Sequence, residues 1–300
     1  MTIYSFDRRI IDPARKPWGA PDIGTPVSSP DLDHGPGPGE ESLTYDETTD
    51  TGYYGLVDSG DFISGDDLCS AIGLSAGNSQ HSDTPWMKFY VGPDAACNAF
   101  VRRGETAQAY VAFIPQKPIR YDLVWDDIYD AGAVFGTGDS GPYNSGSNVT
   151  QDAQVTVGEY IFKVRLPTCA RENPFPEEGD VKTWTCDYNI GEGSEWNELI
   201  YRVHEDVPNC EDPTEGVSSR EDDRHGGPQD GDNWETFTDY DLILDYDASG
   251  YGSLSWGQET READTESRAL RGNNGVGFFD DGRHAYTTRG FRPVLELVQA

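Results

Sequence analysis

The chain has 300 residues, of which 54 are acidic and 22 basic, so its formal net charge is −32 at pH 7. This balance disfavours direct nucleic-acid binding, because such affinity rests on Lys and Arg side chains that neutralise phosphates. No run approaches the ~20 apolar residues of a membrane-spanning helix, so we expect no membrane insertion. Seven Trp, sixteen Tyr and twelve Phe compensate for a hydrophobic fraction of only 35% and can supply the core of one large or two modest domains.

The excess of carboxylates indicates adaptation to high salt. Only five of the 22 basic residues are Lys, which leaves 22 − 5 = 17 Arg. At ordinary salt such a net charge destabilises a compact chain by self-repulsion. At molar salt the Debye length falls to ~3 Å and most of that penalty disappears. The composition therefore resembles that of proteins from halophilic organisms and their viruses. An ordinary acidic protein is the plainer alternative, and a DNA-mimicking inhibitor is a third, although such mimics concentrate their charge on a smaller body.

Residues 1–45 are predicted to form an extended anchoring arm. They hold seven Pro (13, 17, 21, 26, 30, 36 and 38) and only isolated apolar residues, so they cannot bury a core of their own. We expect neighbouring subunits to hold this arm, as in a component of a larger particle. A flexible tail is the alternative.

Residues 46–170 are predicted to be an N-terminal α+β half. Alternating or β-branched runs predict a strand at Tyr53–Val57, paired strands at Trp86–Val91 and Tyr110–Pro115, and a hairpin at Val155–Leu166. A helix should begin after Ser64, whose hydroxyl is an N-cap with Asp67 three residues on. A second short helix is expected at Asp126–Ala133.

Residues 171–300 form the second predicted half. Ser194 is the expected N-cap of a helix whose apolar residues recur at helical spacing, namely Trp196, Leu199, Ile200 and Val203. A strand is expected at Ser253–Thr260, and the apolar run Phe291–Val298 is typical of a strand in the centre of a sheet.

Between them lies a long polar segment, Asn209–Asn233, that carries candidate metal ligands. Its carboxylates could bind Ca²⁺ or Mg²⁺: Asp222, Asp223, Asp230 and Asp232. Their spacing fits no EF-hand loop, so a solvated acidic face is the competing interpretation. His204, near the end of the preceding helix, is interpreted as a helix-terminal residue, with a metal ligand as the alternative.

The five cysteines, at positions 69, 97, 169, 186 and 210, show no C-x-x-C spacing and therefore predict no zinc knuckle. We expect buried thiols that act as small apolar residues. One disulfide among Cys169, Cys186 and Cys210 is the alternative.

Six short stretches in one order carry a resemblance to a known fold. They are Ser64–Leu74, Lys117–Val134, Gly193–Asn197, Ser255–Thr260, Arg271-Gly272 and Arg289–Arg292. The chain resembles the fold shared by C-type lectins and formylglycine-generating enzymes, and within it the C-terminal regions of phage tail and virion adhesins. This implies an α+β, C-type-lectin-like body of short antiparallel sheets with a few short helices and long loops, preceded by the arm.

In the resembling adhesins, the loop between Arg-Gly and Gly-Phe-Arg displays the contact residues. The resemblance transfers that role to Asn273, Asn274, Phe278, Phe279, Asp280, Asp281, Arg283, His284 and Tyr286. Aromatic and Arg anchors among adaptable Asn and Gly residues suit a recognition surface. The alternative is that the aromatic residues are buried under a sheet, because Phe-Phe-Asp-Asp-Gly is also typical of a strand end and turn. Arg271, Arg289 and Arg292 are expected to be structural, tying this segment to buried carboxylates such as Glu259.

No enzymatic motif is present, and we expect no catalytic activity. Formylglycine-generating enzymes use a cysteine pair near the C-terminal end of the fold, and this chain has no Cys after position 210. The expected function is that of a virion surface structural protein of a tailed virus: a tail fibre, baseplate or head turret or spike. It would be a homo-oligomer anchored to other virion proteins by its arm, and it would bind a host cell-surface protein or glycan. The alternative is a decoration or cementing protein without a receptor. A hydrolase is a third hypothesis and needs a compact pocket with converging acids.

Overall fold

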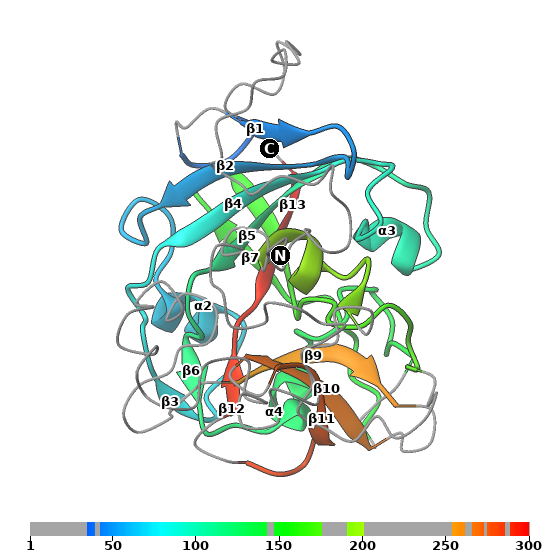
Figure 1. Ribbon diagram of the computed structural model, residues 1–300. Helices are drawn as coiled ribbons and strands as arrows, with labels where there is room; N and C mark the ends of the chain where they lie inside the picture. Colours follow the sequence, from blue (N-terminus) through cyan, green and yellow to red (C-terminus); the bar gives the residue numbers. More distant parts are fainter. Residues whose placement is uncertain are drawn as a thin grey trace, which may run out of the picture.

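The structure is a computed structural model, and it describes residues 35–39, 43–142, 147–175, 191–200, 254–261, 266–272, 275–285 and 289–299. These residues form two sheets with a few short helices (Figure 1). This agrees with the sheet-rich α+β class expected from the sequence.

The first sheet has seven strands, all joined by antiparallel pairs. In spatial order these are β1 (Thr44–Asp46), β2 (Thr51–Val57), β4 (Trp86–Val91), β5 (Tyr110–Pro115), β13 (Val294–Gln299), β8 (Tyr160–Arg165) and β7 (Gln154–Val157).

The second sheet has six strands, antiparallel except for the β12–β9 pair. In spatial order these are β11 (Gly275–Asp281), β10 (Ser267–Gly272), β9 (Leu254–Thr260), β12 (Arg289–Phe291), β6 (Arg120–Tyr121) and β3 (Asn78–Ser79).

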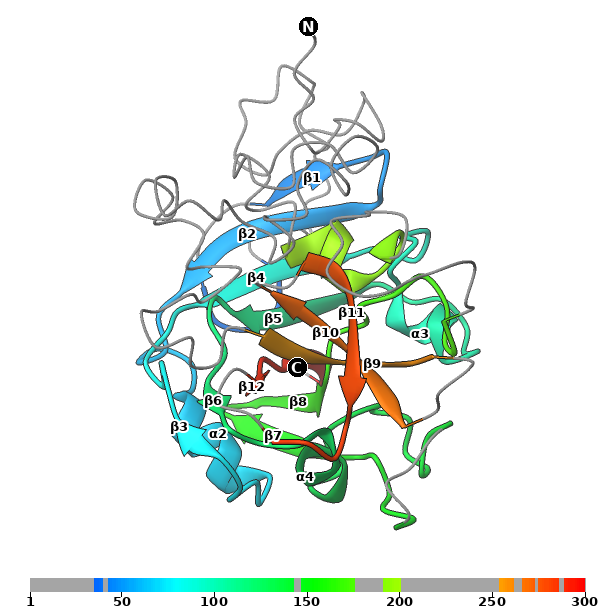
Figure 2. The same ribbon diagram turned by 60° about the horizontal axis from the view of Figure 1, so that its bottom comes forward.

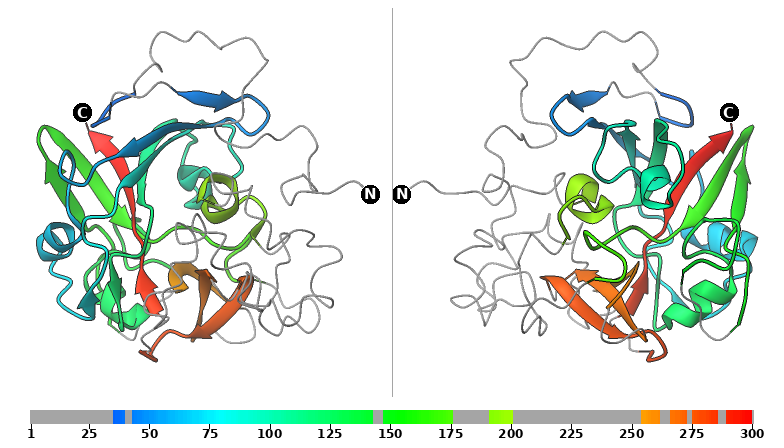
Figure 3. Two further views of the ribbon diagram at one scale, coloured as in Figure 1. Left: turned by 60° about the vertical axis from the view of Figure 1, so that its left-hand side comes forward. Right: turned by 90° about the vertical axis from the view of Figure 1, so that its right-hand side faces the viewer.

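The last two strands join the sheets to one another. The apolar run Phe291–Val298 was expected to be one central strand, but it divides at Arg292-Pro293, where the backbone passes from β12 in the second sheet to β13 in the first. β13 then inserts between β5 and β8, as the red strand in Figure 3 shows. The two predicted halves therefore share both sheets. Residues 1–34, which make up most of the predicted arm, lie outside the described residues.

The strands predicted from alternation are confirmed. β4 and β5 have the predicted bounds and pair antiparallel, with Trp86 opposite Pro115 and Val91 opposite Tyr110. The predicted hairpin at 155–166 is β7–β8, which turns at Gly158 with φ +61°.

The helices are short, and the predicted start of the first one is confirmed. Helix α2 (Gly65–Ala71) begins after Ser64, whose Oγ accepts a hydrogen bond from the Asp67 N–H at 3.1 Å. Helix α3 (Ala99–Arg102) is capped by Asn98. Helix α4 (Trp125–Asp130) ends earlier than predicted, because the chain reverses through Gly132 at φ +73°.

The predicted helix after Ser194 is a π-helical turn, η1 (Trp196–Ile200), within the described residues. Trp196, Leu199 and Ile200 are buried as predicted, and the Ser194 hydroxyl accepts from the Asn197 N–H at 3.3 Å. Val203 lies outside the described residues.

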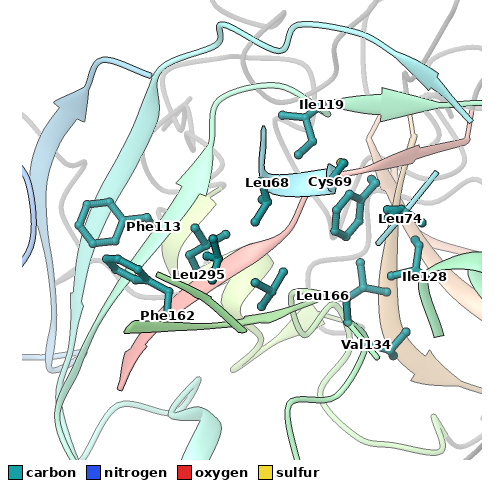
Figure 4. Close-up of a cluster of buried hydrophobic side chains, with 14 of the residues drawn as sticks. Leu68, Cys69, Leu74, Phe113, Ile119, Ile128, Val134, Phe162, Leu166 and Leu295 are labelled. Carbon is teal, nitrogen blue, oxygen red and sulfur yellow. The ribbon is translucent and has the colours of Figure 1, made fainter. Parts of the chain in front are cut away.

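The main core fills the space against the seven-stranded sheet, between it and α2 and α4. Figure 4 shows this cluster, in which Phe113, Phe162 and Leu295 come from β5, β8 and β13. Phe113 and Phe162 meet edge to face, with ring centroids 5.5 Å apart. A second cluster packs η1 against the same sheet through Trp196, Leu199 and Ile200.

A charge network whose other members are buried, with Arg103 at its partly exposed edge, connects the second core cluster to the sheet. The Arg165 guanidinium donates to both carboxylate oxygens of Glu195, at 2.7 and 2.6 Å, and through Nε to Glu296 at 2.9 Å. Arg103 donates to both oxygens of Glu296 at 3.0 Å. The Tyr110 hydroxyl donates to Glu195 at 3.2 Å. The sequence did not predict this network, because its members are spread over residues 103–296.

Candidate functional site

Within the predicted contact segment, side chains are described for the turn that follows β11, residues 281–285. It begins with a local hydrogen-bond pattern, since Asp281 Oδ1 accepts from the Arg283 N–H at 2.9 Å. The Asp281 carbonyl oxygen also accepts from the His284 N–H at 3.1 Å. An Asp that bonds the backbone two residues further on is a standard way of forming a turn.

The turn is fixed against helix α4, as Figure 2 shows for the loop leaving β11. The Gly282 carbonyl oxygen accepts from the Trp125 N–H at 2.8 Å and from the Asp126 N–H at 3.4 Å, so it caps the start of the helix. The Gly282 N–H donates to the Glu266 carbonyl oxygen at 3.0 Å. A Cβ at position 282 would lie 2.9 Å from Arg268 Cγ, so glycine allows this close approach.

Buried arginine and aromatic side chains pack against the inner side of the turn. The Arg268 guanidinium lies over the Trp125 ring, 4.1 Å from its centroid, and is almost fully buried. Trp125 Nε1 donates to the Gly257 carbonyl oxygen at 3.1 Å, and its ring stacks on Tyr129. This packing connects the turn to β9 and β10.

Charged side chains lie on the outer face of the turn. Arg283 donates from Nε and Nη2 to the two oxygens of Asp281, both at 3.1 Å, and from Nη2 to Glu266. The hydrogen bond from Arg283 lowers the pKa of Asp281. His284 Nε2 lies 3.9 Å from Asp281 Oδ2, and the His284 side chain is 59% exposed. The outer face therefore presents a guanidinium held by two carboxylates beside an accessible imidazole.

The predicted exposed loop is largely a strand, which corrects the expectation from the sequence. Residues 275–281 form β11, antiparallel to β10, with Phe279 opposite Ala269 and Phe278 opposite Leu270. The competing interpretation, a strand end followed by a turn, describes the backbone better. The structure describes the backbone of Phe278, Phe279 and Asp280 but not their side chains, while Asn273, Asn274 and Tyr286 lie outside the described residues.

The bracketing arginines are buried, as expected of structural residues. Arg271 donates to the carbonyl oxygens of Leu270 and Cys169. Burial lowers its pKa, and Glu259 partly offsets this through a favourable electrostatic interaction. Arg292 donates to the carbonyl oxygens of Pro115 and Gln116. The expectation that carboxylates would be the partners is thus incomplete, because backbone carbonyls accept from both side chains.

Glu259 belongs to a cleft of about 200 Å³ beside helix α3. Its lining includes Arg102, Arg103, Arg171 and Glu172 as well as Glu259. Burial raises the pKa of Glu259, but Arg102 Nη2 lies 3.2 Å from its Oε1, and its Oε2 accepts from the Cys169 N–H at 2.8 Å. Because both oxygens are engaged, this carboxyl group is held in place rather than turned toward a ligand.

Three cysteines of the described residues, Cys69, Cys97 and Cys169, are buried free thiols, as the sequence predicted. Burial raises the pKa of each. The disulfide alternative for Cys169 is therefore wrong. Cys186 and Cys210 lie outside the described residues.

No group of three or more metal-ligating side chains occurs in the part of the chain that the structure describes. The candidate Ca²⁺ or Mg²⁺ ligands Asp222, Asp223, Asp230 and Asp232 lie outside it, as does His204. Among the described helices, none is both long and apolar enough to cross a membrane.

Comparisons with family models, with curated proteins and with solved structures give no match for this chain. Its function is therefore argued from its own residues and contacts.

Proposed function

We propose that this chain is a surface structural protein of a tailed-virus particle, and that it binds a host-cell receptor through the β10–β11 hairpin and the following turn. In this proposal the body is C-type-lectin-like, the N-terminal arm attaches it to other virion proteins, and several copies act together. Repetition of weak sites on one particle raises the overall avidity. The acidic composition suits a particle that meets its host in concentrated salt.

The observation that carries the proposal is that the side chains of the turn are exposed while its backbone is held in place by hydrogen bonds. Arg283, His284 and Ala285 are exposed, yet the Gly282 backbone is hydrogen-bonded to α4 and to Glu266. A surface that is ordered before binding loses less conformational entropy when a partner docks. Exposed polar side chains that are held in place before binding therefore favour a role in recognition over a purely structural role for this turn.

The charge arrangement favours recognition at short range. At molar salt the Debye length is ~3 Å, so long-range steering of a partner is screened. Contacts must then come from groups already in position, and the Arg283 guanidinium is held by Asp281 and Glu266. Its planar face and the adjacent His284 ring suit stacking and short hydrogen bonds with a receptor group.

The test is binding of the purified full chain to host-cell envelopes at molar salt, with competition against virus adsorption. We expect saturable binding that blocks adsorption. Replacing His284, Phe278, Phe279 and Tyr286 by Ala should weaken binding by roughly tenfold or more, as for hot-spot residues.

A matched control is Thr156→Ala on β7, an exposed residue of the other sheet, which should bind like the wild type. A correctly folded chain that does not bind host envelopes at any accessible concentration would contradict the receptor proposal. So would equal loss of binding in the control.

One observation favours the alternative of a decoration or cementing protein. Among the described strands, β11 is the terminal one of its sheet, and a terminal strand offers a row of backbone N–H and C=O groups to another chain. If neighbouring virion subunits extend this sheet, substitution of Phe278 and Phe279 should prevent incorporation into particles. Under this alternative, even the unsubstituted isolated chain would not bind a receptor.

A further inference from the structure

Lys88 lies in β4 with its side chain buried beneath residues 35–39, a Gly-Pro-Gly-Pro-Gly segment. Its side-chain amine donates to the carbonyl oxygens of Pro38 at 3.0 Å, Gly37 at 3.3 Å and Gly35 at 3.5 Å. A lysine ammonium has three N–H donors and no acceptor. These carbonyl oxygens are among the acceptors that the buried ammonium needs.

The three glycines fit closely against the strands below. A Cβ at Gly35 would lie 2.5 Å from the Tyr54 hydroxyl, and one at Gly37 would lie 3.0 Å from Phe113 Cζ. At Gly39 the nearest atom would be a Val57 methyl carbon at 2.8 Å. Tyr54 and Val57 belong to β2 and Phe113 to β5, on either side of β4 (Figure 1).

The prolines make this segment suitable for an apolar, hydrogen-bond-poor surface. Pro36 and Pro38 have no backbone N–H, so neither leaves a donor without a partner when the segment lies on side chains. The segment is bent, with φ of +59°, +90° and +99° at Gly35, Gly37 and Gly39, and only its two prolines have a fixed φ that lowers the entropy lost on docking. The groups that still need partners are the carbonyl oxygens, and Lys88 supplies donors to them.

Aromatic rings complete the surroundings of the ammonium. Lys88 Nζ lies 4.9 Å from the Tyr54 ring centroid and 5.6 Å from that of Phe113. Ring faces attract a cation, which compensates for part of the water that it loses. Burial lowers the pKa of Lys88 to about 8, so the amine is still mainly protonated at neutral pH.

The Tyr54 hydroxyl is buried and makes no hydrogen bond to any described residue. Burial also raises its pKa to about 12, so it remains a neutral donor. The segment thus accepts hydrogen bonds from Lys88 but none from the Tyr54 hydroxyl.

We propose that Lys88, Tyr54, Phe113 and Val57 form a docking site for a glycine–proline peptide segment. The chain's own residues 35–39 occupy the site, and their attachment fixes where the N-terminal part of the chain leaves the body. Neither the receptor-binding proposal nor its alternative is required for this inference. It concerns a different surface, on β2, β4 and β5.

The experiment measures how fast an amine-acylating reagent modifies each lysine of the full chain at molar salt, read by peptide mass spectrometry. Lys117 and Lys163 are partly exposed internal references, whereas Lys88 is 1% exposed. In the wild type, Lys88 should react far more slowly than both. Gly35→Ala should raise the Lys88 rate by roughly an order of magnitude, since the new Cβ overlaps Tyr54 and detaches the segment.

Gly158→Ala is the matched control. Gly158 has φ +61°, close to the +59° of Gly35, but a Cβ there meets nothing within 4 Å. Both variants carry the same backbone strain, and only Gly35→Ala should expose Lys88. Equal Lys88 rates in the wild type and in folded Gly35→Ala would overturn the proposal, as would an equal rise in the control.

A synthetic peptide of residues 33–41 tests whether the groove binds a segment that is not covalently attached to the chain. Added to Gly35→Ala at several times the ~mM effective concentration of a tethered segment, it should slow Lys88 acylation again. The same peptide with Gly35 and Gly37 replaced by Val should have no effect. Failure of the native peptide to protect Lys88 would refute a docking site, because the segment would then be held only by its covalent connection.

Discussion

Glu296 lies within the apolar C-terminal strand, yet its carboxylate is among the most strongly bonded groups of the described residues. Burial alone would raise its pKa, but the Arg165 guanidinium and the hydrogen bonds from Arg103 outweigh burial and lower the pKa to about 2. A buried ion pair contributes little relative to an apolar replacement, but removing one partner is costly. The network is therefore expected to specify how β13 pairs with β8 and to make stability depend on pH.

The first prediction concerns this pH dependence. A carboxylate whose pKa is lower in the folded chain stabilises it fully above the unfolded pKa, ordinarily about 4.5, and loses that contribution as the pH falls toward 2. At 1.36 kcal/mol per pKa unit the contribution is about 3 kcal/mol. Glu296→Gln should thus be several kcal/mol less stable than the wild type at pH 7, and the difference should shrink between pH 4.5 and pH 2.

Denaturant unfolding in molar salt across this pH range is the measurement. Glu105→Gln is the control, because Glu105 pairs with the same Arg103, at 2.8 Å, but its side chain is 42% exposed whereas that of Glu296 is buried. It should cost less than about 1 kcal/mol. If the stability difference between Glu296→Gln and the wild type stayed constant down to pH 2, the lowered pKa of Glu296 would not be the source of the pH dependence.

At the scale of elements, the junction between the turn after β11 and helix α4 rests on Gly282. Its φ does not lie in the left-handed region, so the glycine is required by space and not by backbone conformation. Any side chain at this position pushes against Arg268 Cγ and Trp125 Cβ, at 2.9 and 3.2 Å. The helix would then lose the carbonyl that caps the N–H groups of Trp125 and Asp126.

We therefore predict that Gly282→Ala destabilises the chain by roughly 1–3 kcal/mol, as overpacking of a filled site does. Hydrogen exchange at the amides of Trp125 and Asp126 should accelerate, while exchange in α2 should not. Gly60→Ala is the control, because its new Cβ would meet only the end of the Asp58 side chain, at 3.1 Å. Unchanged exchange at the start of α4 would show that the turn is not fixed there.

Elements with strong local patterns were predictable, and their pairing was less so. β4 and β5 have the predicted bounds because each alternates over six residues against one continuous core. The segment that forms β11 was predicted to be part of a loop. Its glycines and asparagines are typical of turns, but pairing with β10 supplies backbone hydrogen bonds that local propensity does not reveal.

The candidate site was predictable only in part, for the same reason. The motif Asp281-Gly282 indicated a turn, and Arg283 and His284 are exposed beside it. The support from Arg268 and Trp125 was not predictable, since their contact joins residues 143 positions apart (268 − 125). Lys88 is one of five lysines in the sequence, and no pattern near it predicts residues 35–39 as its partner.

At the scale of the whole molecule, the net charge of −32 is distributed over a body with several internal ion pairs. Charges in the buried network are shielded from salt, whereas surface carboxylates repel one another through solvent. Salt should therefore strengthen the fold by weakening repulsion at the surface, and leave the buried pairs nearly unchanged.

We predict that the thermal midpoint rises by on the order of 10 °C between about 0.1 M and about 3 M KCl, since several kcal/mol of repulsion is removed. Differential scanning calorimetry of the full chain measures this. Sucrose at matched water activity is the control for general solvent exclusion, and it should raise the midpoint less. A midpoint that does not depend on KCl would contradict adaptation to high salt.

The sheet-rich class and the strands and caps with clear local patterns follow from the sequence alone. These features depend on which face of a segment is apolar, and that pattern is local. The folded chain alone shows that β13 inserts between β5 and β8, that Glu296 meets Arg165 from 131 positions away, and that Lys88 bonds to residues 35–39. Such contacts depend on which distant segments meet in space. A single charged residue in an apolar run has no local pattern that predicts which residue will pair with it.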